Sequence, residues 1–120
     1  MTWTYEQATG RMLHDGERVA IGYSGAGDCK NDPAAQDVHN AGPIPRGTYT
    51  INAPVDTVTH GPYVLALTPA ADNNMCGRSG FLIHGDSVVH PGTASQGCVI
   101  MPKMVRENIW ESNDNQLEVI

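Results

Sequence analysis

Apolar and polar residues alternate over short stretches of this chain, and glycine or proline separates the stretches. Thirteen glycines and eight prolines stand among the 120 residues, so few stretches can extend into a long element. Alternation with a period of two is typical of strands buried on one face. The sequence therefore predicts a mainly β fold, with strands over residues 3–5, 11–14, 18–23, 46–52, 63–67, 81–83 and 117–120.

Two of the remaining patterns point to the surroundings of a site. Residues 81–83 are wholly apolar, which predicts a central strand buried on both faces. Residues 24–42 are polar and rich in Gly, Asp and Asn, which predicts a long surface loop. Such loops often border functional sites, since a rigid scaffold holds them in place.

One segment near the C-terminus follows a helical period instead. Met101, Met104, Val105 and Ile109 stand at i, i+3, i+4 and i+8, which places them in one apolar stripe of a helix. Pro102 suits the first position of that helix, where its missing N–H has no partner to lose. We expect one short helix here, ended by the polar residues that follow.

Length and charge limit the organisation of the chain and its partners. The 120 residues fit one domain, residues 1–120. A net charge of −6 argues against binding to nucleic acid or to an anionic membrane, because both repel an acidic protein. No stretch approaches the length of a membrane-spanning helix, and no basic region followed by an apolar run marks a signal peptide.

The three cysteines differ in their surroundings. No Cys-x-x-Cys pair is present, which argues against a zinc ribbon or a thioredoxin-like site. Cys29 and Cys76 are interpreted as small buried residues, or as a disulfide if the protein is exported. Cys98 stands out, because Gly97 precedes it and apolar residues follow it.

A nucleophile and its base are the chemistry that the stretch 81–101 predicts. Cys98 follows His84 by fourteen residues, a loop long enough to fold back and bring the two side chains together. An imidazole can take the thiol proton and leave a thiolate for acyl transfer. Amide groups around Gly97 can hold an oxyanion. His90 is the rival base, although its place before Pro91 favours a gating role.

Five further residues are candidates for supporting roles, each with an ordinary structural alternative. Asp86 orients a histidine or caps a turn, and Ser95 donates a hydrogen bond near the sulfur or shapes the turn. Arg46 and Arg78 bind a substrate carboxylate in bidentate fashion or lie solvated on the surface. Tyr23 forms a wall of the groove or packs in the core.

These motifs together resemble the active-site signature of L,D-transpeptidases. That signature has a His-Gly pair followed by Ser-His-Gly-Cys, matched here by His84-Gly85 and Ser95-Gln96-Gly97-Cys98. Residues 44–51 look like the family's Thr-Pro-x-Gly-x-(Phe/Tyr)-x-Ile strand. Gln96 replaces the histidine of the signature, and Ile100 stands where many members carry arginine or asparagine. These departures resemble a compact branch of L,D-transpeptidase-like effectors delivered by type VI secretion.

The resemblance implies a single-domain β-sandwich or barrel with one short helix and an enzyme that modifies peptidoglycan. Cys98 would be acylated by a stem tetrapeptide, and water or a D-amino acid would resolve the acyl-enzyme. The Gly85 carbonyl would orient His84, with no metal or organic cofactor. As an effector, the protein would be made in the cytoplasm, act in the periplasm of a target cell and be neutralised by an immunity protein.

Two alternatives of other classes stay open at this point. One is a non-catalytic wall-binding module with the same fold, which needs neither thiolate nor base. The other is a metal site built from His84, Asp86, His90 and Cys98, which supply nitrogen, oxygen and sulfur ligands.

Overall fold

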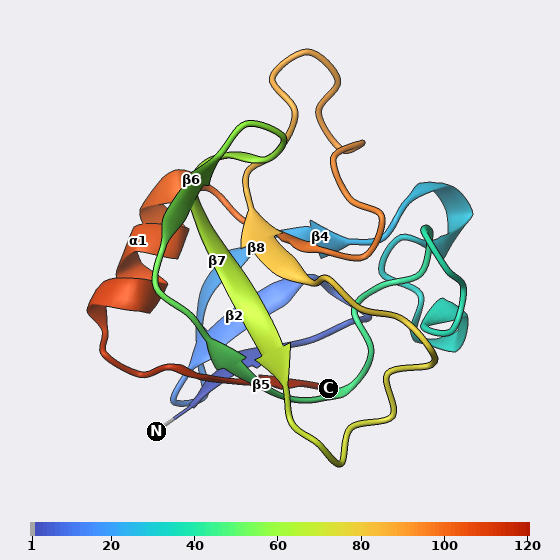
Figure 1. The fold of residues 1–120 in the computed structure, drawn as a ribbon, viewed down its shortest axis with the longest axis horizontal. Coiled ribbons are helices and arrows are strands. Elements are labelled where there is room, and N and C mark those ends of the chain that lie inside the picture. The colour runs from blue at the N-terminus through green and yellow to red at the C-terminus, as the bar shows by residue number, and fades with distance from the viewer. Residues whose placement is uncertain (1) are drawn as a thin grey trace.

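A continuous path of hydrogen-bonded strands organises the chain in the computed structural model, which describes residues 2–120 (Figure 1). Short elements predominate, as the alternating pattern predicts, and the mainly β fold with one helix near the C-terminus is confirmed. The strands are β1 (Trp3–Tyr5), β2 (Arg11–His14), β3 (Glu17–Ile21), β4 (Tyr23–Ser24), β5 (Gly47–Ile51), β6 (Val55–Thr57), β7 (Gly61–Pro69), β8 (Leu82–His84), β9 (Val99–Ile100) and β10 (Gln116–Val119). The helical segments are two 3₁₀ turns, η1 (Gly27–Cys29) and η2 (Pro33–Ala35), and the α-helix α1 (Lys103–Glu111).

The strand order is β3-β2-β1-β10-β5-β7-β8-β9-β4, with β6 paired to β7 beside this path. Most neighbours are antiparallel. Two pairs are parallel: β1 with β10, which brings the two ends of the chain together, and β8 with β9. The second parallel pair matters for function, because it sets the register of the segments that carry the predicted nucleophile and base.

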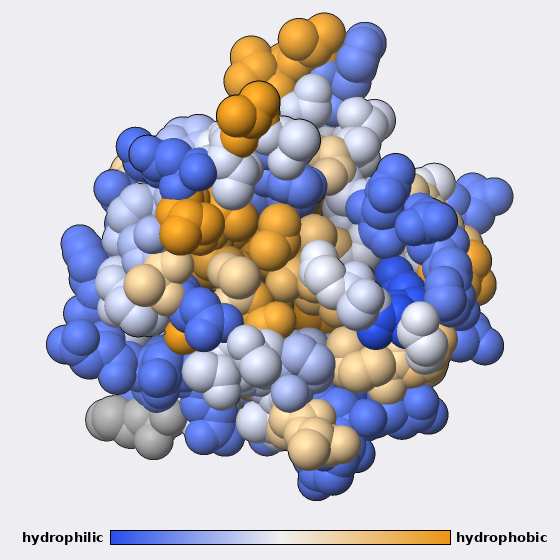
Figure 2. All heavy atoms as spheres, in the orientation of Figure 1, coloured by the Kyte–Doolittle hydropathy of each residue, from blue (hydrophilic) through white to orange (hydrophobic). Residues whose placement is uncertain are grey.

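Between β8 and β9 the chain leaves the sheet as a long loop, residues 85–98, which rises above the rest of the molecule at the top of Figure 1. Figure 2 shows apolar side chains over the tip of this loop. Val88 and Val89 are the exposed apolar residues there, at 95% and 78% exposure.

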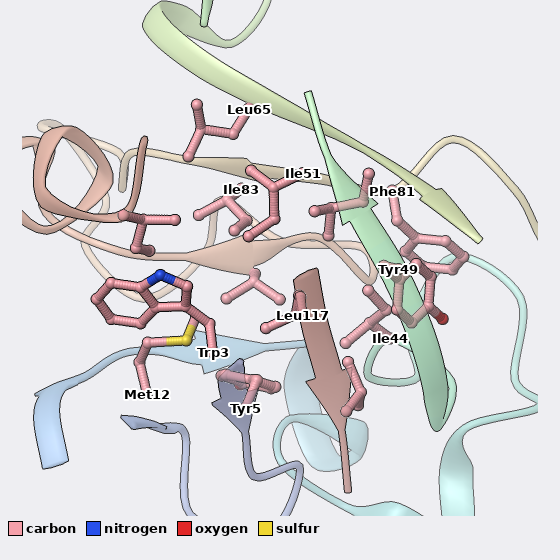
Figure 3. Packing of buried hydrophobic residues seen from close by; sticks show 14 of the residues in the cluster. Trp3, Tyr5, Met12, Ile44, Tyr49, Ile51, Leu65, Phe81, Ile83 and Leu117 are labelled. Atoms are coloured by element: carbon pink, nitrogen blue, oxygen red, sulfur yellow. The ribbon is translucent and has the colours of Figure 1, made fainter. Parts of the chain in front are cut away.

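The hydrophobic core gathers inward-facing residues from both ends of the chain and from its middle (Figure 3). In β1 and β10, every second residue is buried, which is the alternation that the sequence shows. The largest fully buried side chains of the core are Trp3, Tyr5, Tyr49, Met12, Ile44, Ile51, Leu65, Ile83, Met101, Ile109 and Leu117. Burial of side chains this large supplies most of the stability of such a fold.

Several local predictions need correction. The strand predicted over 18–23 breaks at Gly22 into β3 and β4. The backbone passes so close to Ile100 there that a Cβ on residue 22 would lie 1.8 Å from the Ile100 carbonyl oxygen. The chain crosses closely at that point and then pairs as β4 with β9. The predicted loop 24–42 contains η1 and η2, and β6 was not predicted.

The central position of β8, between β7 and β9, is as predicted, but its burial is incomplete. Phe81 and Ile83 are buried, whereas Leu82 is only partly so. The prediction of burial on both faces was therefore wrong for one face, which is the face that turns toward the site.

The helix differs from its predicted stripe in two ways. Pro102 lies at the N-cap with ψ 155°, one residue before the helix, and Met104 is 81% exposed. Arg106 and Ile109 are the buried residues of α1. The face that packs against the sheet thus carries a charged side chain in place of a predicted methionine. None of the helices within residues 2–120 combines the length and apolar character that crossing a bilayer requires.

Candidate active site

A pocket of about 950 Å³ opens beside the loop 85–98. It collects segments that are far apart in the sequence: residues 39–40, 59–62, 77–81, 84–88, 93–94, 96–98 and Arg106. Both predicted reactive residues, His84 and Cys98, are among its lining residues. The pocket is therefore the place to look for their chemistry.

Strand register explains why His84 and Cys98 meet there. In the parallel pair β8/β9, Ile83 lies opposite Val99. His84 follows this pair and Cys98 precedes it, so their side chains alternate away from the core face occupied by Ile83 and Val99. Both side chains consequently turn to the same face of the sheet, and both reach the pocket.

The imidazole of His84 is buried and held in one orientation. Its Nδ1 lies 2.9 Å from the Gly85 carbonyl oxygen, the orienting contact that was expected. A carbonyl oxygen only accepts, so Nδ1 carries the proton and the neutral ring keeps its acceptor lone pair on Nε2. Burial lowers the pKa of His84 below its ordinary value; the hydrogen bond to Gly85 opposes this shift, and the charges of His60 and Arg106 add to it. His84 is thus a neutral base at neutral pH.

Cys98 is also neutral in this structure. Burial raises the pKa of the Cys98 thiol, although a backbone hydrogen bond at Leu82 and the charge of Arg78 oppose the shift. The Sγ atom lies 3.9 Å from the Gly80 carbonyl oxygen. The site therefore contains a neutral thiol and a neutral imidazole, so any reaction needs a base to take the thiol proton as the sulfur attacks.

Ser95 holds the turn that presents Cys98. This serine is 1% exposed, and its hydroxyl donates to the Cys98 carbonyl oxygen at 2.6 Å. The Ser95 hydroxyl oxygen in turn accepts from the amides of Gly25 at 2.8 Å and Gly97 at 3.1 Å. Of the two alternatives for Ser95, these contacts match the shaping of the turn. The Gly97 amide does not face the groove as expected, because Ser95 engages it.

Arg78 braces the same turn from the other side. Its guanidinium carbon lies 5.1 Å from the centroid of the Phe81 ring. Both terminal nitrogens donate to backbone carbonyl oxygens at 2.7–3.1 Å, those of Gln36, Pro43, Gly42 and Gln96. The guanidinium that was expected to bind a substrate carboxylate is thus used to hold two loops together.

Tyr23 and Asp86 clamp the base of the loop 85–98. The Tyr23 hydroxyl donates to Asp86 at 2.5 Å and accepts from the Ala94 amide at 3.0 Å. Amides of Ser87 and Gly92 also donate to the Asp86 carboxylate. Burial acts to raise the pKa of Asp86, but these hydrogen bonds outweigh it and leave the pKa below its ordinary value. Asp86 organises the loop, while Gly85 orients His84.

Four predicted residues do not line the pocket. Tyr23 and Ser95 act from behind the lining, through the contacts described above. His90 is exposed at the loop tip and Arg46 is exposed beside Gln36. The four-residue metal site therefore does not assemble. Among residues 2–120, the His, Cys, Asp and Glu ligand atoms that gather closely belong to His14, Asp15 and Asp114, far from Cys98 in the sequence. All three cysteines are free, so Cys29 and Cys76 do not pair.

Three ionisable residues that line the pocket were not among the predicted site residues: Arg106, His60 and His39. The ring centroid of His60 lies 4.7 Å from that of His84. His39 lines the pocket and contacts the Cys76 carbonyl oxygen at 3.1 Å. An arginine on the face of α1 that carries Ile109 was the one available signal, since a charge at a core-facing position needs a reason.

A comparison with protein families identifies one match. The family model described as the Tlde1 domain matches residues 18–120. It covers β3, except for Glu17, and every later element, while β1 and β2 precede it and pair into the same sheet. Neither the curated proteins nor the solved structures include a match. The chain belongs to the Tlde1 domain family, a family of type VI secretion effectors.

Proposed function

We propose that this effector is a cysteine enzyme that modifies peptidoglycan, with Cys98 as nucleophile and His84 as general base. It acts on stem tetrapeptides as an L,D-transpeptidase that exchanges the terminal D-amino acid, as an L,D-carboxypeptidase that removes it, or as both. The damage to the wall of a rival cell makes it an antibacterial toxin. Its site of action is the periplasm of the target cell, and a matching immunity protein protects the producer.

One observation carries the proposal: the Gly85 carbonyl fixes the tautomer of His84 in a pocket shared with Cys98. A neutral imidazole whose Nε2 is an acceptor is the form that can take a thiol proton. The lowered pKa of His84, caused first by burial, keeps it in that form at neutral pH. The turn held by Ser95 then keeps Cys98 in place for attack.

The chemical steps follow from these roles. The Cys98 sulfur attacks the carbonyl carbon of the bond between the L-centre of the third residue and D-alanine, while its proton passes to Nε2 of His84. Collapse of the tetrahedral intermediate breaks the C–N bond, and His84 returns the proton to the leaving amine. Since Ser95 occupies the Gly97 amide, the Cys98 amide is the candidate donor to the oxyanion. Water or the amine of a D-amino acid then cleaves the thioester.

Incubation of the purified protein with stem tetrapeptides tests the proposal. Mass spectrometry should detect a tripeptide product in water, and an exchanged tetrapeptide when D-methionine is added. It should also detect an acyl adduct on wild-type protein and none on the Cys98→Ala variant. A folded protein that binds peptidoglycan but gives neither product nor adduct would instead favour the non-catalytic wall-binding module.

A further inference from the structure

The helix α1 places a second arginine at the pocket, and its hydrogen bonds leave part of it unused. Arg106 is 5% exposed. Its Nε donates to the Met101 carbonyl oxygen at 3.1 Å, and its Nη1 donates to those of Pro62 at 2.7 Å and Tyr63 at 2.9 Å. Within residues 2–120, Nη2 has no hydrogen-bond partner. Three of the five N–H groups of the guanidinium are therefore engaged, and the two on Nη2 remain.

The free nitrogen lies on the wall of the pocket beside His84. A Cβ built on Gly85 would lie 2.9 Å from Nη2, so the absence of a side chain at position 85 makes room for the guanidinium. Both Arg106 and Gly85 line the pocket. Among residues 2–120, the side-chain nitrogen and oxygen atoms that are fully buried without a hydrogen-bond partner are Tyr5 Oη and Gln7 Oε1. Arg106 Nη2 is not one of them, so this atom is open to the pocket and not sealed in the core.

Arg106 also has no direct ion-pair partner. Within residues 2–120, charged side chains lie within ion-pair distance at Arg11–Glu6 and at the contacts of His14 with Asp15 and Asp114, and no carboxylate lies that close to Arg106. Glu107 stabilises its charge only from farther away. A cation removed from water without a counter-charge is costly, whereas an anionic ligand placed on it restores the balance. Arg78, the other arginine of the pocket, offers no such site because four carbonyl oxygens occupy its terminal nitrogens.

We propose that Arg106 Nη2 binds the free α-carboxylate of the D-amino acid that leaves from, or enters, the acyl-enzyme. This inference rests on the proposed function. His84 returns its proton to the leaving amine, and one carbon atom separates that amine from the carboxylate of the same residue. A carboxylate receptor next to Gly85 therefore lies where the end of the peptide arrives. It selects stem peptides whose scissile bond joins the last residue, and D-amino acids with a free carboxylate as acceptors.

Two substrates test this without disturbing the fold: a stem tetrapeptide ending in D-alanine and the same peptide ending in D-alaninamide. Wild-type protein should show a kcat/KM higher by about 10- to 100-fold for the carboxylate, the range for a charge-assisted hydrogen bond. The two leaving amines differ in basicity, so the decisive quantity is how much this selectivity changes in a variant. Arg106→Gln should reduce the ratio of the two kcat/KM values to the ratio that the different basicity of the two leaving amines alone would give. Arg106→Lys should retain part of the wild-type selectivity.

The matched control is Arg78→Lys, a change at the other buried arginine of the pocket. It should lower stability and leave the carboxylate selectivity at the wild-type value. Unchanged selectivity in folded Arg106→Lys or Arg106→Gln, or a wild-type enzyme that does not discriminate, would overturn the inference while the cysteine mechanism stands. If Arg106→Gln does not fold, Arg106→Lys decides. Failure of wild-type protein to process either peptide would overturn both the inference and the proposed function.

Discussion

The guanidinium of Arg78 packs directly against the backbone of Gly97. A Cβ built on Gly97 would lie 2.5 Å from Nη2 of Arg78 and 2.8 Å from Cε1 of Phe81, and the φ of Gly97 is +145°. The guanidinium thus lies directly against the backbone of the residue that precedes Cys98. It is held there because Nη2 of Arg78 donates to the carbonyl oxygens of Gly42 and Gln96.

This contact predicts a large effect for a single methyl group. Gly97→Ala should destabilise the protein by about 3 kcal/mol, since it combines a steric clash with a backbone conformation that L-residues rarely adopt. Activity should fall as Cys98 is displaced. Gly16→Ala is the matched control: its φ is +85°, but nothing lies within 4 Å of the added Cβ. It should cost only about 1 kcal/mol in urea denaturation, and equal losses in the two variants would argue against the clash.

The nucleophile is tested by Cys98→Ala. Loss of the sulfur should reduce turnover of the stem tetrapeptide by at least about 1000-fold, because no acyl-enzyme can form. The stability should change little, since Cys98 is only partly buried and its sulfur makes weak contacts with the backbone at Gly80 and Leu82. Cys29→Ala is the control, a second free cysteine outside the pocket, and should keep full activity. Full activity in folded Cys98→Ala would rule out cysteine catalysis.

The role of His84 predicts a pH profile for the reaction. Burial lowers the pKa of His84 from its ordinary 6.5, so the base stays neutral until the pH falls below that value. The acidic limb of kcat/KM should therefore lie below pH 6.5. His84→Gln should abolish the limb together with most of the activity, and should slow alkylation of Cys98 by iodoacetamide at neutral pH. His90→Gln changes a histidine outside the pocket and should preserve both properties; the reverse ranking would make His90 the base.

The same shift predicts how stability depends on pH. A histidine whose pKa is lower in the folded state binds its proton first in the unfolded state. Stability should consequently decrease as the pH falls from about 6.5 toward the folded pKa, and be unaffected by His84 above that range. Subtracting the urea-denaturation free energies of His84→Gln from those of wild type at each pH isolates this contribution. A difference that stays constant between pH 7 and pH 5 would contradict the shift.

Features that depend on the local residue pattern could be predicted from the sequence, and features that depend on pairing between distant segments could not. The alternation in β1 and β10 is a property of the residues themselves, so these strands were predicted within a residue or two. The two-residue strand β9 was not, because it exists through pairing with β8 and β4, which are distant in the chain. The candidate reactive residues could be picked out by residue type, since His84 stands in a His-Gly pair and Cys98 in a Gly-Cys pair.

The supporting residues could not be assigned in that way. An arginine has the same appearance in the sequence whether its donors are occupied or free. Only the fold reveals that both terminal nitrogens of Arg78 donate to carbonyl oxygens, while Nη2 of Arg106 is open to the pocket. Similarly, Asp86 stands two residues from His84 in sequence, yet its carboxylate accepts from Tyr23.

The clamp between Tyr23 and Asp86 supplies the last prediction, which concerns the loop 85–98. Tyr23→Phe removes one hydroxyl that donates to Asp86 and accepts from Ala94. Burial, and then the hydrogen bond to Asp86, raise the pKa of Tyr23 to about 12, so the hydroxyl stays protonated and keeps donating throughout the working pH range. Without it, amide exchange over residues 86–94 should accelerate and KM should rise, because this loop forms part of the pocket.

A matched control exists in the same protein. Tyr5→Phe removes a hydroxyl that is buried without a partner, so its loss should leave stability unchanged or increase it by about 1 kcal/mol. Tyr23→Phe should instead cost about 1–2 kcal/mol, since it leaves the Asp86 carboxylate and the Ala94 amide each short of one hydrogen bond. Hydrogen exchange monitored by mass spectrometry distinguishes the two variants: faster exchange confined to the loop 85–98 in Tyr23→Phe, and none in Tyr5→Phe. Equal protection of that loop in both variants would mean that Lys30, whose Nζ donates to the Gly92 carbonyl oxygen at 2.6 Å, holds the loop without the clamp.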